Sequence, residues 1–168
     1  TATSILSVTS AMPDHMISGF LRAPARVGAF SGGDLAVADS SMGAIIYMPA
    51  AGGTPTGMLN VPGVSGTAVD WADRLLVGTP SGAAVLDRLG NLVFNLVPPS
   101  PFGEVTDVAV DLQGQRYVVL YGQPGRVILF DSTGTVALGL GSNGTGTDQF
   151  QSACAVAVSP TGQILVGD

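Results

Sequence analysis

The stretch that decides the fold runs from Glu104 to Gly141 and reads EVTDVAVDLQGQRYVVLYGQPGRVILFDSTGTVALGLG. It contains four short apolar runs, at 108–110, 116–120, 127–130 and 136–140, and a glycine-containing turn signal separates each run from the next. Strands of this length, bounded by Gly, Pro and Asp, predict a four-stranded antiparallel meander. One such sheet is too small to bury both of its faces, so we expect copies of it to pack beside it.

Copies of this unit recur along the chain. Their clearest marker is an apolar residue that opens a short strand, and these markers are Leu35, Leu75, Tyr117 and Ile164. They lie roughly 40 to 47 residues apart, which is the period of a propeller blade with four strands per unit. We therefore predict an all-β fold, a β-propeller with three complete blades and parts of others.

The repeat period also predicts how the chain is divided. We expect a single propeller domain over 1–168, with an outer strand and lead-in at 1–25, blades at 26–61, 62–97 and 98–141, and a partial blade at 142–168. Because the last unit contains only two of the four strands, we expect the natural chain to be longer. The inner strands are expected near 26–30, 66–70, 106–111 and 153–158. Four small side chains on them should crowd towards the central channel or the packing between blades: Ala29, Ala68, Ala109 and Ala157.

The repeats resemble NHL repeats. Residues 150–168, with the glycine-rich segment before them, follow that pattern of an aromatic residue, an Ala-Val strand, a turn glycine and an apolar strand ending in Asp. The segment 36–39 resembles the "V-A-D" end of the family repeat, and 108–114 resembles its "V-A-V-D-x-x-G" entry. The Asn and Arg that follow "V-A-D" in the family are mostly absent. The resemblance therefore implies the propeller fold and no family-typical ligand.

Composition favours a turn-rich folded domain and argues against several classes of partner. Hydrophobic residues make up 46% of the chain and charged residues 11%, with 24 Gly and 11 Pro, a mixture typical of all-β structure and not of disorder. The net charge is −6, and all six basic residues are arginine. Such a chain offers no extended basic surface for phosphates, so we expect no nucleic acid and no anionic membrane as partner. No apolar run reaches the length of a membrane-spanning helix, so we expect no membrane insertion.

Residues suited to catalysis or metal binding are few. The chain has one Cys (Cys154), one His (His15) and one Glu (Glu104). A Cys/His zinc site or a c-type haem attachment needs more such residues. The sequence therefore predicts no catalytic residues, no metal site and no cofactor. We expect Cys154, which enters an inner strand between two alanines, to be a small buried side chain.

The topology of a four-stranded blade predicts where a partner binds. Loops that join the second strand to the third, and each outer strand to the next inner strand, emerge on one face, and here those loops are the longer ones. Recognition usually lies on long loops held by a rigid scaffold. We predict protein binding there, with Phe102 and Tyr121 as aromatic anchors and Trp71, in a hairpin tip, as a further contact. The alternatives are that Phe102 packs between blades and that Trp71 covers a blade edge.

Three functions are compatible with these observations. The favoured one is a non-catalytic scaffold that binds another protein, as a subunit of an exported or cell-surface assembly. That function places the protein in the periplasm or outside the cell, with its leader already removed. The second is a propeller hydrolase or lyase whose metal site lies in blades missing from this chain. The third is a structural repeat that assembles with copies of itself.

Overall fold

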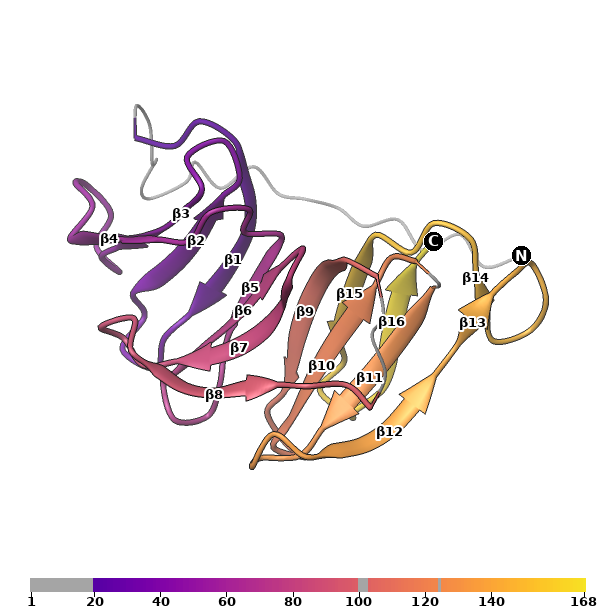
Figure 1. Ribbon diagram of the computed structural model, residues 1–168. Helices are drawn as coiled ribbons and strands as arrows, with labels where there is room; N and C mark the ends of the chain where they lie inside the picture. The colour runs from indigo at the N-terminus through magenta and orange to yellow at the C-terminus, as the bar shows by residue number, and fades with distance from the viewer. Residues whose placement is uncertain (1–19, 100–102, 124) are drawn as a thin grey trace, which may run out of the picture.

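Three four-stranded antiparallel sheets follow one another along the chain (Figure 1). They are seen in a computed structural model that describes residues 20–99, 103–123 and 125–168, and no helix occurs within these ranges. The first sheet contains β1 (Pro24–Ala29), β2 (Leu35–Asp39), β3 (Ala44–Met48) and β4 (Gly57–Asn60). The second contains β5 (Gly66–Val69), β6 (Leu75–Thr79), β7 (Gly82–Leu86) and β8 (Leu92–Leu96). The third contains β9 (Val105–Asp111), β10 (Arg116–Tyr121), β11 (Arg126–Phe130) and β12 (Val136–Leu140).

Two smaller pairs complete the described chain. The short strands β13 (Ser142–Asn143) and β14 (Gln149–Phe150) pair in parallel, and β15 (Ala155–Val158) pairs with β16 (Ile164–Gly167) in antiparallel. We call the three large sheets blade 1 (β1–β4), blade 2 (β5–β8) and blade 3 (β9–β12), and the pair of β15 and β16 blade 4.

The sheets are arranged as blades of a β-propeller. Strands within each large sheet follow chain order, so each sheet is a meander. The first strands of the four blades, β1, β5, β9 and β15, lie next to one another, and Figure 1 shows the sheets side by side along that row. This arrangement confirms the predicted all-β propeller class. The four strands also overlap the predicted inner strands at 26–30, 66–70, 106–111 and 153–158.

Aspartate side chains hold several of the tight turns. Asp87 accepts hydrogen bonds from the main-chain N–H groups of Leu89 and Asn91, at 2.9 and 2.8 Å. Asp131 makes the same pattern in the corresponding turn of blade 3. A carboxylate that caps its own turn in this way replaces the hydrogen bonds that the strands cannot supply there.

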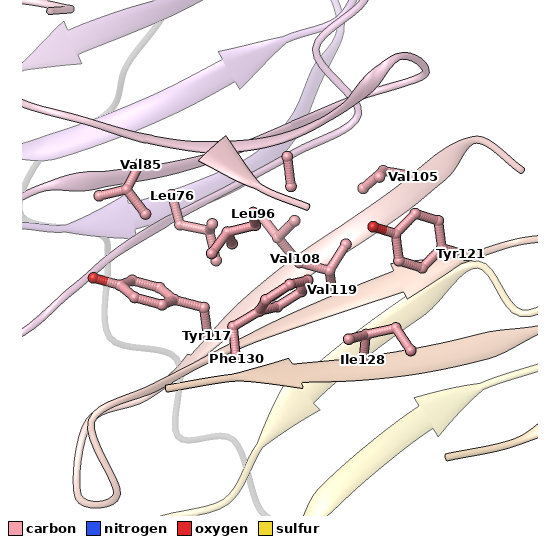
Figure 2. Close-up of a cluster of buried hydrophobic side chains, with 11 residues drawn as sticks. Leu76, Val85, Leu96, Val105, Val108, Tyr117, Val119, Tyr121, Ile128 and Phe130 are labelled. Atoms are coloured by element: carbon pink, nitrogen blue, oxygen red, sulfur yellow. The ribbon is translucent and has the colours of Figure 1, made fainter. Parts of the chain in front are cut away.

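The largest apolar core lies between blades 2 and 3 (Figure 2). Alternation along β10 explains its composition, because Tyr117, Val119 and Tyr121 lie on one face of the strand and all are buried in this core. They join Ile128 and Phe130 of β11 in facing blade 2. Blade 2 contributes several aliphatic side chains, among them Leu76, Val85 and Leu96. Each large apolar side chain buried here contributes about 1.5 to 3 kcal/mol, so this interface stabilises the stack of blades.

Two glycines allow neighbouring inner strands to approach closely. A Cβ on Gly28 would lie 2.9 Å from a methyl group of Val69, and one on Gly66 would lie 2.9 Å from the main-chain nitrogen of Val108. We expected the inner-strand alanines to occupy such crowded positions. All four line the groove along the inner strands, as expected, but Ala29 and Ala157 are exposed, so the expected crowding is absent at those two positions. The close contacts are made where the side chain is absent altogether.

The connections between strands alternate between two faces. One face, called the loop face, carries the described residues 40–43, 61–65, 80–81, 97–99, 103–104, 122–123, 125 and 141–154. The other, called the turn face, carries 30–34, 49–56, 70–74, 87–91, 112–115, 131–135 and 159–163. Most turn-face connections are short, as predicted. The exception is 49–56, which extends well beyond the tight turn expected at its start.

Candidate functional site

A groove of about 410 Å³, called the channel, runs along the inner strands of all four blades. Its walls are mainly apolar and include Val27, Val69 and Leu112. Charged side chains line the channel only at the end nearer the loop face, where Arg26 and Asp107 lie. The channel is thus an apolar groove with one ion pair at its mouth.

Arg26 connects blades that are not neighbours in sequence. Its Nε donates a hydrogen bond of 2.7 Å to Oδ1 of Asp107, and its Nη2 donates one of 3.1 Å to the carbonyl oxygen of Cys154. Arg26 lies on β1 of blade 1, Asp107 on β9 of blade 3, and Cys154 immediately before β15 of blade 4. The hydrogen bond to Asp107 raises the pKa of Arg26, so the guanidinium is charged at neutral pH.

Asp107 is fully engaged by protein groups. Its Oδ1 also accepts the main-chain N–H of Val108, and its Oδ2 accepts that of Val156 on β15, both at 2.9 Å. The side chain is only 3% exposed. Because its oxygens are already bonded, this carboxylate joins blades 1, 3 and 4 and is not presented as a free base.

A second polar cluster lies on the turn face between blades 2 and 3. Asp70 accepts a hydrogen bond from Nε of Arg74 at 2.8 Å and one from the hydroxyl of Tyr117 at 2.9 Å. The guanidinium of Arg74 also lies 5.9 Å from the ring centroid of Trp71 and 5.7 Å from that of Phe94. Burial and the hydrogen bond to Asp70 raise the pKa of the Tyr117 hydroxyl. The cluster binds the β5–β6 turn of blade 2 to blade 3.

Of the residues predicted to bind a partner, the two that the structure describes lie apart. Phe102 lies outside the described residues. Tyr121 is 2% exposed in the core between blades 2 and 3, and burial raises the pKa of its hydroxyl to about 12. Trp71 is half-buried against Tyr117, with ring centroids 5.1 Å apart, on the turn face. Tyr121 and Trp71 therefore lie at opposite ends of the blades, and the ring of Tyr121 is not presented to a partner in this conformation.

Cys154 differs from its prediction. Its side chain is exposed, whereas a small buried residue was expected. The reason is its position just before β15, at the mouth of the channel, where its main-chain carbonyl meets Arg26. The sequence did contain a signal for this network, because Arg26 and Asp107 are charged residues inside two of the predicted inner strands.

Two further observations concern the described residues as a set. Within 20–99, 103–123 and 125–168, no three His, Cys, Asp or Glu side chains come together in a way that could hold a metal ion. Over the same ranges, no helix has the length and apolar character that crossing a membrane requires.

The aspartates predict how stability responds to acid. Six aspartate pKa values are lowered, those of Asp34, Asp39, Asp73, Asp87, Asp111 and Asp131. Burial alone would raise the pKa of Asp39, but the N–H groups of Arg22, Met42 and Ala23 lower it. In the unfolded chain the pKa of an aspartate is about 3.9. Their contribution to stability is therefore complete above that value and is lost as the pH falls through the lower folded pKa values.

We expect the free energy of unfolding, measured by urea denaturation, to be nearly constant from about pH 7 to 5 and to fall below about pH 4. Asp39→Asn should make this fall shallower, because it removes one of the titrating carboxylates. A protein that became more stable between about pH 4 and 3 would contradict the lowered pKa values of these aspartates.

The fold and the channel together define the class of the protein, which is a β-propeller. Neither a protein-family model nor a curated protein sequence matches the chain. Solved structures do match it. One is hydrazine synthase of Kuenenia stuttgartiensis, a protein that contains a β-propeller, with a TM-score of 0.68 and 14% sequence identity. The similarity covers 94% of this chain and 45% of that one, so this chain spans less than half of the similar structure. At this identity the similarity shows the fold alone.

Proposed function

We propose that this chain is a non-catalytic propeller scaffold that binds another protein through its loop face. The observation that carries the proposal is the common direction of connections from different blades. Residues 61–65, 97–99 and 141–154 emerge on the same face, and all are held by packed sheets. Variable connections on a rigid framework are where recognition usually lies.

The hydrogen bonds of the buried aspartates support a scaffold function over a catalytic one. Asp39, Asp70, Asp107 and Asp111 are all buried, and each accepts at least one main-chain N–H group. The last three are also paired with an arginine. Carboxylates engaged in this way hold turns and blades in place, which is what a scaffold requires.

The resemblance to NHL repeats extends the proposal. It favours an exported protein, in the periplasm or outside the cell, that serves as a subunit of an assembly. The net charge of −6, with arginine as the only basic residue type, favours a protein partner over nucleic acid. The similarity to hydrazine synthase supports the propeller fold of this proposal and no activity.

Site-specific photo-crosslinking tests the proposal. A photoreactive amino acid is placed either at Gln123, exposed on the loop face, or at Leu89, which is 85% exposed on the turn face. Each variant is irradiated in extract of the source organism. We expect a discrete crosslinked protein from the Gln123 position and none from Leu89. That protein should then bind the unlabelled wild-type chain saturably when both are purified.

Two outcomes would count against the scaffold. Equal crosslinking from both faces would remove the loop face as the binding surface. A native mass that shows stable self-association, together with crosslinks only to this chain, would instead support assembly with copies of itself.

A further inference from the structure

The interface between blades 1 and 2 is closed at one end and open at the other. On the turn face, Arg88 of blade 2 stacks 4.0 Å from the ring centroid of Phe30 and donates a hydrogen bond of 3.0 Å to Asp34. The hydroxyl of Tyr47 donates to the carbonyl oxygen of Arg88 at 2.9 Å. Towards the loop face lies instead an open groove of about 420 Å³, lined by Val61 of the connection between the two blades and otherwise by residues within 77–98. We call it the interblade groove; its lining includes Val61, Val77, Thr79, Ala84, Asn95 and Val97.

Comparison of the repeats shows why this groove exists. Leu75 and Tyr117 hold equivalent positions in β6 and β10, each paired with the strand before and the strand after, so Thr79 corresponds to Tyr121. Strand pairing carries the equivalence to the neighbouring strands. Thr79 pairs with Gly82 where Tyr121 pairs with Arg126, and Val77 pairs with Ala84 where Val119 pairs with Ile128. Val119, Tyr121 and Ile128 pack against blade 2, and Val77 packs against blade 1. Because paired residues of antiparallel strands share a face of the sheet, Arg126 lies on the blade 2 side, and Thr79, Gly82 and Ala84 lie on the blade 1 side.

Blade 2 therefore carries small residues where blade 3 carries large ones. Thr79, Gly82 and Ala84 replace a tyrosine, an arginine and an isoleucine of the equivalent interface. A Cβ built on Gly82 would meet no atom within 4 Å, which confirms that space is open above it. An interface left unfilled forgoes the contacts that stabilise its neighbour. A repeat that departs from its own packing rule marks a position where function is expected.

The chemistry of the lining limits what can occupy the groove. None of the lining residues is charged, and the walls are mostly aliphatic. Polar groups lie at the margin, where Thr79 and Ser81 place their hydroxyls 3.0 Å apart. The Asn95 side chain lies on β8, the edge strand of blade 2, and makes no hydrogen bond with the described residues. An amide donates and accepts at once, which suits the main chain of an extended peptide.

We propose that the interblade groove binds an apolar side chain carried on an extended, uncharged segment of the partner protein. The side chain fills the space above Gly82 and Ala84, and Asn95 hydrogen-bonds the main chain of the segment. A buried apolar anchor with a polar margin is the usual form of an interface hot spot. This inference rests on the proposed protein-binding function and names the segment that the partner supplies.

Peptide titration of the isotope-labelled chain, followed by NMR, tests the groove directly. The probes are acetylated, amidated nonapeptides of serine and threonine that carry leucine or phenylalanine at the centre. We expect saturable shifts at the amides of residues 79–84 and 95–97, with a dissociation constant below about 1 mM. Peptides with aspartate or lysine at the centre should bind at least tenfold more weakly.

Two variants fill the groove with the side chains of blade 3. Ala84→Ile reproduces Ile128, and Thr79→Tyr reproduces Tyr121 should the first variant fold poorly. Either should weaken peptide binding at least tenfold while the melting temperature is kept or raised. Ala137→Ile, the same change at an exposed position of β12, is the matched control and should leave binding unchanged.

Several results would overturn the groove proposal. They are absence of shifts at 1 mM peptide, shifts confined to other residues, or unchanged binding by the folded Ala84→Ile variant. Equally tight binding of N-acetyl-leucine methylamide would identify a small-molecule pocket instead of a peptide site. Failure of the groove proposal can be distinguished from failure of the proposed scaffold function. A partner crosslinked at Gln123 that binds Ala84→Ile normally removes the groove and leaves the scaffold, whereas absence of any partner removes the scaffold.

Discussion

Replacement of Asp70 by alanine is expected to lower the free energy of unfolding by about 3 to 5 kcal/mol, the range measured when one partner of a buried ion pair is removed. The Asp70 side chain is fully buried, whereas that of Arg74 is 24% exposed. The variant would leave Arg74 without its carboxylate and the Tyr117 hydroxyl without its acceptor. The main-chain N–H groups of Ala72 and Arg74 would lose their partner as well.

Two control variants separate the parts of this effect. Tyr117→Phe removes a single hydroxyl and should cost about 1 to 2 kcal/mol. Asp131→Ala removes the carboxylate of a similar but exposed turn, and its loss should be clearly smaller than that of Asp70→Ala. Urea denaturation of the four proteins gives the comparison. Equal losses for Asp70→Ala and Asp131→Ala would show that the turn, and not the contact between blades, determines stability.

Asp107→Ala should destabilise the protein by about 2 to 3 kcal/mol, with an effect concentrated at the contact between blades 3 and 4. The cost is lower than at Asp70 because the side chain of Arg26 is one-third exposed and regains water. The N–H of Val156 lies in a buried hydrogen bond, so water cannot replace its lost acceptor. Faster hydrogen exchange at the Val156 amide should therefore be the clearest local sign that this bond is lost.

Amide hydrogen exchange checks this localisation. In Asp107→Ala, exchange at Val156 should accelerate by more than at Val85, which lies between blades 2 and 3. Arg26→Gln is the companion variant, because it removes the charge but leaves the bond from Val156 to Asp107 intact. Uniform acceleration at Val156 and Val85 would mean that the whole chain opens, and the proposed role of Asp107 at blade 4 would be wrong.

The sequence predicted the sheets well because their signals are local. Apolar runs separated by Gly, Pro and Asp define four-stranded meanders, and the spacing of Leu35, Leu75, Tyr117 and Ile164 gives the repeat. Turn-capping aspartates such as Asp131 also act within a few residues of their own position. Nothing in these signals depends on the distance between blades.

The candidate site was harder to predict because it depends on contacts between repeats. Tyr121 was assigned to a loop, yet it shares a strand face with the anchor Tyr117, and strand alternation would have placed it in the core. The bond from Arg26 to Asp107 joins residues 81 positions apart, so the two charges stand out in their own strands but no local pattern pairs them. The interblade groove was detectable in principle, since alignment of the repeats sets Thr79 and Ala84 against Tyr121 and Ile128.

The reach of Arg26 has a consequence for the history of such a gene. Tandem repeats are gained and lost by recombination, and blades that contact only their neighbours tolerate such changes. Arg26 instead passes blade 2 to meet Asp107 of blade 3 and the carbonyl of Cys154 beside blade 4. Deletion or duplication of one unit would set it opposite another residue and leave a buried carboxylate without its cation. The stability of this part of the chain therefore depends on the number and order of its blades, and not only on contacts between neighbouring ones.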